Sequence, residues 1–372
     1  MKTSQLLTRR ITFMSLITLS VTATWAADPP QQSKLRITNH CDQTIWIQQD
    51  FTHHTNDKIV EKIDKGAFHD YVIPDIGLSS TRFWPKQGCN EYGYDCTLGE
   101  SVGVDAEIAA GHQHGPYWTD MKVQGYFAPG IDSKLEATWG CSTSIYSKNP
   151  EKCALNPSDL TKHLDSNTWW NGSAVDGYTL PFRINIKNHQ GSCRDAQHGN
   201  DPVPNPGVDC SGLDMSMCPM DEDLSTKNAF DIINKIPVNA VNLQFKHLGD
   251  GNITGCFSPC SKLTLAQGSR MPQDATGKEI ENMSGGWANI LGGLTPSSPA
   301  AQMYCCPTPP VSPEGCRAGP ASNSRYLHSV QEKQHCPIYT YAYDDASGLG
   351  ICSAETQFEV IFCPTNADAD AR

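Results

Sequence analysis

Sixteen cysteines are the residues with the most varied chemistry in this chain of 372 residues. Thiols can form disulfides, ligate metal ions or carry out redox catalysis, and the compartment decides which of these occurs. The number is even, and the chain opens with a segment typical of exported proteins. An exported thiol meets an oxidant before it meets a reducing buffer, so we predict that the cysteines pair in disulfides.

The first 26 residues predict a secretory signal peptide. Three basic residues precede the apolar run 11–25, and the small residues Ala26 and Ala27 follow it,. We expect cleavage after Ala26 and a secreted, extracellular protein, or a periplasmic one in a bacterial host. Residues 27–34 then form a short polar segment. No second apolar run is long enough to cross a bilayer, so stable membrane insertion is not expected.

The twelve histidines are weaker candidates for chemistry. Gly-His-Gln-His-Gly at 111–115 and the pair His53 and His54 have spacings that can bind metal, but their flanks offer no obvious third ligand,. Surface loops are the better interpretation, and neither a metal nor another cofactor is predicted. The chain also has no Gly-x-Ser-x-Gly elbow, no His-Glu-x-x-His motif and no phosphate loop,.

The charge of the chain argues against nucleic acid as a partner. The formal net charge is -12, and removal of the leader, which carries three positive charges and no negative one, makes it -15. A nucleic-acid-binding surface needs a basic stripe to neutralise phosphates, and the lysines and arginines here do not cluster into one.

Short runs rich in β-branched and aromatic residues predict strands, and turn residues separate them. This pattern favours an all-β fold, an antiparallel β-sandwich. One stretch, 221–236, instead suits a helix with acidic residues in its first turn. The expected strands lie within 35–41, 44–47, 80–84, 122–127, 135–139, 178–186, 241–245, 339–343 and 357–362.

The cysteines divide the chain unevenly. Eight of them fall between Cys193 and Cys316, in a region rich in proline and glycine with few strand signals. We expect a disulfide-rich lobe built from loops and helix. Residues 264–302, rich in Gly, Ser and Pro, predict a long surface excursion, and 365–372 predict a frayed, flexible tail.

The sequence resembles those of the thaumatin-like (osmotin-like) proteins. The resemblance covers about 35–364 and is interrupted by insertions at 102–134, 142–168 and 264–302. It implies one domain, with a sandwich core at 35–190 and 337–364 and a lobe at about 191–336. The matching motifs are Ile-Thr-Asn-His-Cys at 37–41, Thr-Ile-Trp at 44–46, Arg-Phe-Trp at 82–84, Val-Asp-Gly-Tyr-Thr-Leu-Pro at 175–181, Tyr-Cys-Cys at 304–306, Cys-Pro-Ile-Tyr-Thr-Tyr at 336–341 and Val-Ile-Phe-Cys-Pro at 360–364.

The resemblance also implies a set of eight disulfides. In one of them the chain departs from the family's pattern, because Gly-Glu-Ser at 99–101 stands where the family has a cysteine-bearing turn. Cys141 and Cys153 are the cysteines left over and form that pair. The implied pairs are Cys41–Cys363, Cys89–Cys96, Cys141–Cys153, Cys193–Cys352, Cys210–Cys336, Cys218–Cys256, Cys260–Cys305 and Cys306–Cys316.

The family has a cleft between sandwich and lobe that one arginine and four acids line. In this chain an amide stands at one of the acid positions, five residues before Asp176, which lowers the negative charge expected there. Arg82 matches the arginine. The residues that match three of the acids are Glu136, Asp176 and Asp344, which has Asp345 beside it. Asn171 stands at the position of the fourth acid.

A typical glycosidase needs a pair of catalytic carboxyl groups. Glu136 and Asp176 could serve as proton donor and nucleophile or base if the fold brings them to about 5–9.5 Å, with Arg82 helping to separate their pKa values. The alternative is a solvated ion-pair network without catalysis. Three nearby aromatic residues could stack on sugar rings or be buried packing. These are Trp169, Trp170 and Tyr178.

These features predict a secreted monomer that binds β-glucan or a related cell-surface polysaccharide through an acidic cleft. One alternative is a weak endo-β-1,3-glucanase that uses Glu136 and Asp176. A second is a membrane-permeabilising or receptor-binding defence protein whose cleft meets a cationic partner. The acidic charge of the mature chain counts against attraction to anionic membranes.

Overall fold

The computed structural model describes residues 33–365 apart from eleven gaps, together with 368. The predicted signal peptide, the strand at 122–127, the 111–115 histidines and most of the excursion at 264–302 lie outside the described residues. The gaps are 51–52, 92, 94–95, 100–133, 188–192, 197–202, 204–206, 226–238, 247–251, 265–295 and 300.

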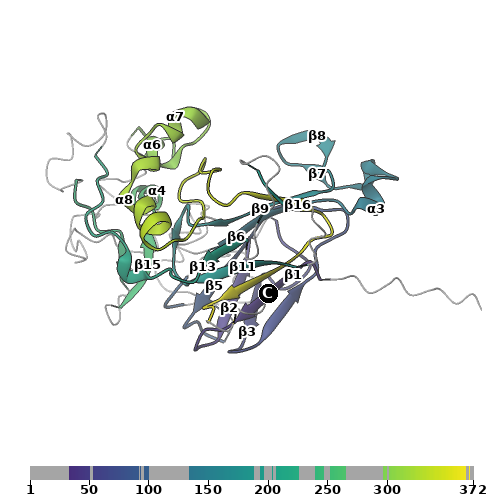
Figure 1. The fold of residues 1–372 in the computed structure, drawn as a ribbon, viewed down its shortest axis with the longest axis horizontal. Helices are drawn as coiled ribbons and strands as arrows, with labels where there is room; N and C mark the ends of the chain where they lie inside the picture. The colour runs from purple at the N-terminus through teal and green to yellow at the C-terminus, as the bar shows by residue number, and fades with distance from the viewer. Residues whose placement is uncertain are drawn as a thin grey trace, which may run out of the picture. The chain divides into compact units, whose positions relative to one another are not determined.

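Two large β-sheets carry the fold (Figure 1). The five-stranded sheet has the order β13-β11-β17-β1-β4, and the seven-stranded sheet has the order β12-β16-β9-β6-β5-β2-β3. All neighbours are antiparallel except β1 and β17, the first and last strands of the described residues, which run parallel. The predicted all-β fold with antiparallel sheets is confirmed.

The strands of the two sheets are short, as the sequence pattern predicts. The five-stranded sheet contains β1 (Leu35–Asn39), β4 (Phe68–Tyr71), β11 (Phe182–Lys187), β13 (Val208–Cys210) and β17 (Gln357–Phe362). The seven-stranded sheet contains β2 (Ile45–Gln49), β3 (Val60–Ile63), β5 (Leu78–Gln87), β6 (Lys134–Trp139), β9 (Asn167–Ser173), β12 (Arg194–Asp195) and β16 (Gly350–Ser353).

Aromatic rings join the two sheets face to face. Phe358 of β17 meets Trp139 of β6 at 5.5 Å and Trp170 of β9 at 5.3 Å between ring centroids. Tyr71 of β4 meets Phe83 of β5 at 5.0 Å. All three contacts are edge-to-face, an arrangement that adds about 0.5–1.5 kcal/mol per pair beyond the area buried. The sandwich is therefore held together by side chains that both sheets direct inward.

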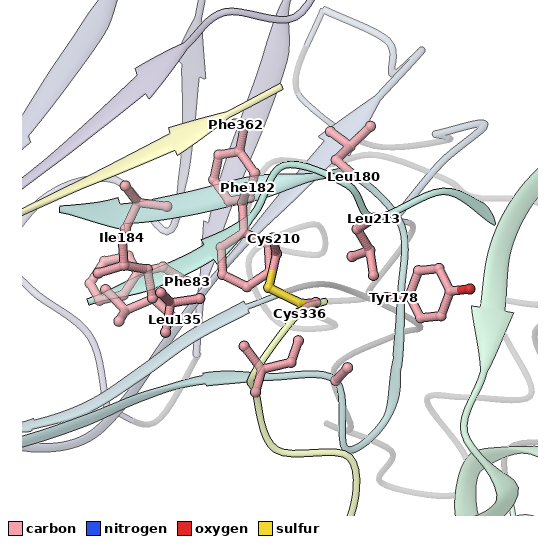
Figure 2. Close-up of a cluster of buried hydrophobic side chains, with 14 of the residues drawn as sticks. Phe83, Leu135, Tyr178, Leu180, Phe182, Ile184, Cys210, Leu213, Cys336 and Phe362 are labelled. Atoms are coloured by element: carbon pink, nitrogen blue, oxygen red, sulfur yellow. A yellow bond between two sulfur atoms is a disulfide. The ribbon is translucent and has the colours of Figure 1, made fainter. Parts of the chain in front are cut away.

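The core continues from the sandwich toward the cysteine-rich part of the chain. Figure 2 shows Phe83 and Leu135 of the seven-stranded sheet packed near Phe182 and Phe362 of the five-stranded sheet, with the Cys210–Cys336 disulfide beside them. Tyr326, which lies far along the chain, belongs to the same cluster of buried side chains. The loop- and helix-rich segments therefore pack onto the sandwich core, and part of them also forms a second, smaller cluster around the Cys306–Cys316 disulfide.

Smaller elements make up the rest of the described chain. The three-stranded sheet β10-β15-β14 lies near several short helices in Figure 1, and β7 pairs with β8 in a hairpin. The small strands are β7 (Leu155–Asn156), β8 (Asp159–His163), β10 (Gly177–Tyr178), β14 (Gln244–Lys246) and β15 (Ile253–Phe257). The helices are α3 (Thr143–Tyr146), α4 (Pro259–Thr264), α6 (Gln302–Cys305), α7 (Pro313–Arg317) and α8 (Arg325–Leu327). The 3₁₀ turns are η1 (Pro150–Lys152), η2 (Met215–Met217) and η3 (Ala321–Asn323), and η4 (His328–Lys333) is π-helical.

Three local predictions were wrong, and tertiary pairing explains each. The expected strand 339–343 is a loop in which only Tyr339 bridges Ser173. The run 178–186 divides into β10 and β11, which join different sheets. The start of the predicted helix, 221–225, is not helical, because the backbone of Glu222 pairs with Val241 in both directions at 2.8–2.9 Å. The remainder of that helix prediction, 226–236, falls outside the described residues.

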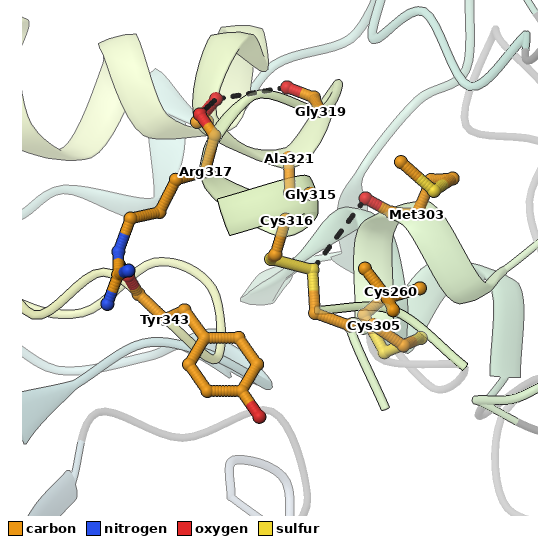
Figure 3. The surroundings of a disulfide bond; sticks show 12 residues. Cys260, Met303, Cys305, Gly315, Cys316, Arg317, Gly319, Ala321 and Tyr343 are labelled. Carbon is orange, nitrogen blue, oxygen red and sulfur yellow. Dashed lines mark hydrogen bonds between the residues drawn. A yellow bond between two sulfur atoms is a disulfide. The ribbon is translucent and has the colours of Figure 1, made fainter. Parts of the chain in front are cut away.

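All sixteen cysteines are in disulfides, and the eight pairs are those that the resemblance implies. Cys41–Cys363 joins the residues just beyond β1 and β17. Figure 3 shows two bridges side by side in the helical region, Cys260–Cys305 and Cys306–Cys316. Each bridge is worth about 2–4 kcal/mol because it constrains the unfolded chain.

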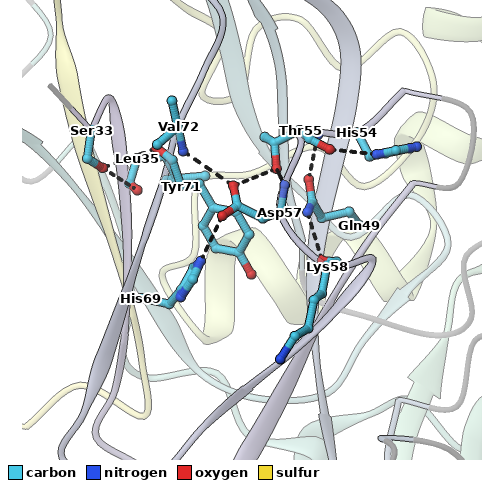
Figure 4. Close-up of polar contacts among 10 residues, drawn as sticks. All are labelled: Ser33, Leu35, Gln49, His54, Thr55, Asp57, Lys58, His69, Tyr71 and Val72. Carbon is cyan, nitrogen blue, oxygen red and sulfur yellow. Dashed lines mark hydrogen bonds and ion pairs between the residues drawn. The ribbon is translucent and has the colours of Figure 1, made fainter. Parts of the chain in front are cut away.

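A polar cluster fixes the loop that follows β2 (Figure 4). Asp57 accepts hydrogen bonds from Thr55 Oγ1 at 2.8 Å and from the backbone N–H of Val72 at 3.4 Å, and it lies 3.2 Å from Nε2 of His69. The amide of Gln49 holds the same loop through Lys58 and Thr55. These contacts tie the loop to β4 and so join the two sheets at one end of the sandwich.

Oxidation of every cysteine leads to a first prediction. Denatured but unreduced protein should show almost no free thiol on titration, because each sulfur is bonded to another. The same protein after reduction should show sixteen. Several free thiols in the unreduced sample, or bound zinc, would contradict this disulfide framework.

A second prediction concerns the pH dependence of stability. Arg183 of β11 is buried and pairs with Asp209 of β13 at 2.8 Å. Burial opposes the charged form of Asp209, but hydrogen bonds from Ser211 and Arg183 outweigh it and lower the pKa of Asp209 below 3.8. A lowered pKa in the folded state stabilises the fold above the unfolded pKa, and that stabilisation is lost as the pH falls through the folded pKa.

Asp209→Asn should therefore cost about 2 kcal/mol near pH 7, less than for a fully buried pair because the Asp209 side chain is 40% exposed,. The difference from the wild type should shrink as the pH falls below 3.8. Denaturant unfolding at several pH values measures it. Asp70→Asn, which breaks the more exposed pair with Arg36, is the control and should cost less than about 1 kcal/mol,. A difference that does not change with pH would contradict the prediction.

Candidate functional site

Three polar side chains line up across neighbouring strands of the seven-stranded sheet. Arg82 of β5 lies opposite Glu136 of β6, and Glu136 lies opposite Asn171 of β9. Nε of Arg82 is 3.0 Å from Oε1 of Glu136. Nδ2 of Asn171 donates to Oε2 of Glu136 at 3.2 Å. We call these three residues the cross-strand row.

Strand alternation places the row on the face of the sheet that points away from the core. In β6, Leu135 and Ala137 are buried, while Glu136 between them is half-buried. The same alternation buries Phe83 next to Arg82 and Trp170 next to Asn171. Because cross-strand partners share a face, the register alone brings the three polar side chains together.

The charge of Arg82 is stabilised by its surroundings. Burial opposes the charged form, but the negative charges of Glu136, then Asp176 and then Asp50 outweigh it and raise the pKa of the guanidinium. The side chain of Arg82 is 41% exposed and that of Glu136 is 23% exposed. Both groups are therefore fixed by each other and still open to a ligand.

Asp176 lies in the loop between β9 and β10, and its partner is a lysine. The ammonium of Lys134, at the start of β6, forms an ion pair and hydrogen bond with Oδ2 of Asp176. The Lys134 side chain is 0% exposed, while that of Asp176 is 28% exposed. A buried ammonium needs such a partner, because taking an isolated charge out of water costs several kcal/mol.

Asp344 is placed differently from the other predicted acids. It is only 4% exposed, and its Oδ2 accepts hydrogen bonds from the backbone N–H and the hydroxyl of Thr340 and from the amide of Gln331, at 2.7–3.0 Å. Burial raises its pKa, although these hydrogen bonds act in the opposite direction. The carboxylate thus organises the 340–344 loop from inside.

Asp345 faces a second arginine and a tyrosine. It accepts a hydrogen bond from Nη2 of Arg317 at 2.5 Å and one from the hydroxyl of Tyr339 at 2.7 Å. Burial raises the pKa of Tyr339, and its hydrogen bond to Asp345 and the charges of Asp345, Asp344 and Glu136 raise it further. The backbone of Tyr339 also bonds to Gly172 and Ala174, so this tyrosine joins the 340–345 loop to the end of β9.

The three aromatic residues near the row differ in their exposure to solvent. Trp170 and Tyr178 are buried, with exposures of 1% and 0%. Trp170 packs on Phe358, and Tyr178 stacks on Tyr326 with 6.0 Å between ring centroids. Trp169 is 42% exposed, on the outer face of the sheet.

The predicted site residues therefore fall into three groups. Arg82, Glu136 and Asn171 form one row, and Asp176 acts on Arg82 electrostatically from the neighbouring loop. Asp344 and Asp345 lie in a separate loop, where Asp345 contacts Tyr339 and Arg317. Sequence reasoning missed the cations that accompany these acids, Lys134 and Arg317. Lys134 had a signal, because it stands two residues before Glu136 on an alternating strand and therefore on the same face.

The described residues show no cluster of three or more His, Cys, Asp or Glu side chains arranged to hold a metal ion. Nδ1 of His54 lies 2.6 Å from the carbonyl of Thr55, and Nδ1 of His53 lies 3.9 Å from Asp50. Both contacts belong to the loop after β2.

Comparisons with known proteins agree with the resemblance. No protein-family model matches the chain. Thaumatin-like protein 1 of Prunus persica is 22% identical over 337 residues, which span 89% of this chain and 90% of that protein. A glucan endo-1,3-beta-glucosidase of Prunus avium is 22% identical over 244 residues, 63% of this chain and 68% of that protein. These sequence relatives confirm the similarity to thaumatin-like proteins.

Among solved structures, a thaumatin-like xylanase inhibitor aligns with 46% of this chain and 81% of its own, at 15% identity. Its TM-score is 0.24, too low to support an argument.

The Lys134–Asp176 pair leads to a third prediction. Lys134→Met should lower the free energy of unfolding by about 3 kcal/mol, at the low end for a buried pair because Asp176 keeps contact with water. Asp176→Asn should cost at least as much, since it leaves the fully buried ammonium without its carboxylate. Denaturant unfolding checks both variants. Lys62→Met, which removes a lysine with a 54% exposed side chain, is the control and should change stability by less than about 1 kcal/mol,. A Lys134→Met variant as stable as the wild type would contradict the prediction.

Proposed function

We propose that this thaumatin-like protein binds a polysaccharide on the face of the cross-strand row, with β-glucan as the first candidate, and that it does not hydrolyse it. The observation that carries the proposal is the pairing of the two candidate catalytic carboxylates. Glu136 is held by Arg82, and Asp176 is held by Lys134.

This pairing argues against general acid catalysis. A glycosidase needs one carboxyl group that carries a proton to the leaving oxygen. Cationic donors occupy Oε1 of Glu136 and Oδ2 of Asp176, and the amide of Asn171 donates to the other oxygen of Glu136. Burial raises the pKa of Asp344, but that side chain is 4% exposed and accepts three hydrogen bonds, so a substrate could not reach it.

The same groups suit recognition of hydroxyl groups. Sugar hydroxyls both donate and accept hydrogen bonds, and the row offers guanidinium donors, carboxylate acceptors and an amide that does both. The groups hold one another in place across three strands, so a ligand would not have to order them. Preorganisation of this kind reduces the entropic cost of binding.

The relatives support the ligand class. One similar protein is named a glucan endo-1,3-beta-glucosidase, which makes a β-1,3-glucan the natural first ligand to test. The same name favours hydrolysis as the second candidate function, with Glu136 and Asp176 as the catalytic pair. A cationic partner is less well supported, because Glu136, Asp176 and Asp345 each already have a basic side chain beside them.

We also propose that the protein works outside the cell. Its sixteen cysteines are all oxidised, which suits an oxidising compartment,. In the described ranges no helix has the length and apolar character needed to span a bilayer.

A fourth prediction tests binding and hydrolysis together. Native gel electrophoresis through laminarin, a soluble β-1,3-glucan, should retard the protein, while prolonged incubation with laminarin should release no reducing ends. Glu136→Gln should weaken retention about tenfold or more, the scale of a lost hydrogen bond to a charged group. Its thermal midpoint should stay within a few degrees of the wild type.

Glu359→Gln is the matched control, because Glu359 is another partly buried, ion-paired glutamate but lies on the five-stranded sheet. Its retention should equal that of the wild type. Reducing ends released by the wild type and lost in Glu136→Gln would establish the glucanase instead. Absence of retention on laminarin and related neutral glucans would refute polysaccharide binding.

A further inference from the structure

Trp169 occupies an unusual place on the outer face of the seven-stranded sheet. It belongs to β9, and its cross-strand partners are Thr138 of β6 and Ile351 of β16. Its side chain is on the same face as Asn171, two residues further along β9,. The aromatic ring therefore lies beside the cross-strand row.

The exposure of this ring distinguishes it from the other tryptophans that the structure describes. Trp169 is 42% exposed, and each of the other four is 9% exposed or less. Those four are Trp46, Trp84, Trp139 and Trp170. A large aromatic side chain that stays half open to water, among polar neighbours, is a typical surface for a ligand with one apolar face.

The charges around Trp169 indicate what kind of ligand fits. Arg82 balances Glu136, and Lys134 balances Asp176, while Asn171 is an uncharged amide where the resemblance leads one to expect an acid. The charges of these five residues therefore cancel, and Asp50, the third acid that acts on Arg82, lies 3.9 Å from Nδ1 of His53. This face complements a ligand that is polar but uncharged.

We propose that Trp169 is the stacking platform for one ring of an uncharged polysaccharide, whose hydroxyl groups reach Asn171 and Glu136. This inference rests on the proposed function and adds a binding residue and a ligand charge to it. A pyranose ring has an apolar face of C–H groups and a polar edge of hydroxyl groups. The apolar face would lie on the Trp169 ring, and the hydroxyl groups at the edge would reach the amide of Asn171. Trp169 and Asn171 lie roughly 7 Å apart along the strand, given a rise of 3.2–3.4 Å per residue.

The neighbours of Trp169 support stacking over simple packing. Ile351, its cross-strand partner on one side, is apolar and 5% exposed, while Thr138, its partner on the other side, is polar and half-buried. Trp169 thus belongs to a strand that is paired on both sides, and the residue keeps 42% of its surface exposed. Rigid aromatic groups of this kind bind at a low cost in conformational entropy.

The test uses variants of the full mature chain in native gels that contain laminarin. Trp169→Thr removes the ring and keeps a residue suited to a strand, and it should lower retention at least tenfold. Trp169→Phe keeps a smaller ring and should lose less than Trp169→Thr. Phe68→Ala is the control, because Phe68 is 52% exposed on β4 of the other sheet and should not affect retention. Thermal unfolding checks that each variant is folded.

Two further measurements address the ligand and the ring directly. Laminarin should shift the tryptophan fluorescence of the wild type, and this change should be lost in Trp169→Phe, which keeps the fold even if Trp169→Thr does not. Retention should vary little with salt, since exposed charges are screened, and should be weaker on cationic chitosan and on anionic polygalacturonate. Preference for either charged polymer would overturn the charge argument.

The two levels of the proposal fail separately. If the wild type is retained by laminarin and Trp169→Thr and Trp169→Phe are retained equally, Trp169 is not the platform, although the proposed function stands. If laminarin retains neither the wild type nor the variants and leaves the fluorescence unchanged, both the proposed function and the role of Trp169 are wrong.

Discussion

The pairing of the first and last strands is the constraint on which the structure depends. β1 and β17 run parallel, side by side in the middle of the five-stranded sheet, and Cys41–Cys363 links their ends across a sequence separation of 322. Bringing such distant residues together costs entropy that grows with the logarithm of the loop length. The disulfide offsets part of that cost. Without β17, both β11 and β1 would lose a hydrogen-bonded neighbour in the five-stranded sheet.

 The last described strand, β17, therefore connects the two halves of the five-stranded sheet.

Once β17 is in place, its side chains determine which face of the other sheet is buried. Phe358 reaches Trp139 and Trp170 across the sandwich. Strand side chains alternate, so burying these rings turns Glu136 and Asn171 outward. A slip of one residue in register would reverse both faces and bury the charged groups. The position of the cross-strand row thus follows from the packing of the core behind it.

The charge pattern on that outward face separates this chain from the acidic cleft that the resemblance implies. Asn171 replaces one acid, and Lys134 neutralises another from a fully buried position. A buried ion pair costs desolvation energy, so it gives weak evidence for stability in itself. Here the pair holds the loop after β9 next to Arg82 and leaves a balanced set of donors and acceptors. That balance is the physical basis for placing recognition of neutral hydroxyl groups ahead of hydrolysis.

The sequence by itself determined the features that depend on residue type and short-range period. Runs rich in β-branched and aromatic residues at 135–139 and 357–362 predicted strands that the structure contains, and the even number of cysteines together with the predicted signal peptide predicted their oxidation. The resemblance supplied the disulfide pairs and the matching residues of the row. Only the tertiary structure decided that Asp176 pairs with Lys134, that Asp344 is buried inside its loop, and that of two adjacent tryptophans Trp169 faces water and Trp170 the core. It also turned the strand-like run 339–343 into a loop, because Asp344 binds Thr340 and Gln331 there. Such outcomes depend on partners far away in the chain, which local patterns do not specify.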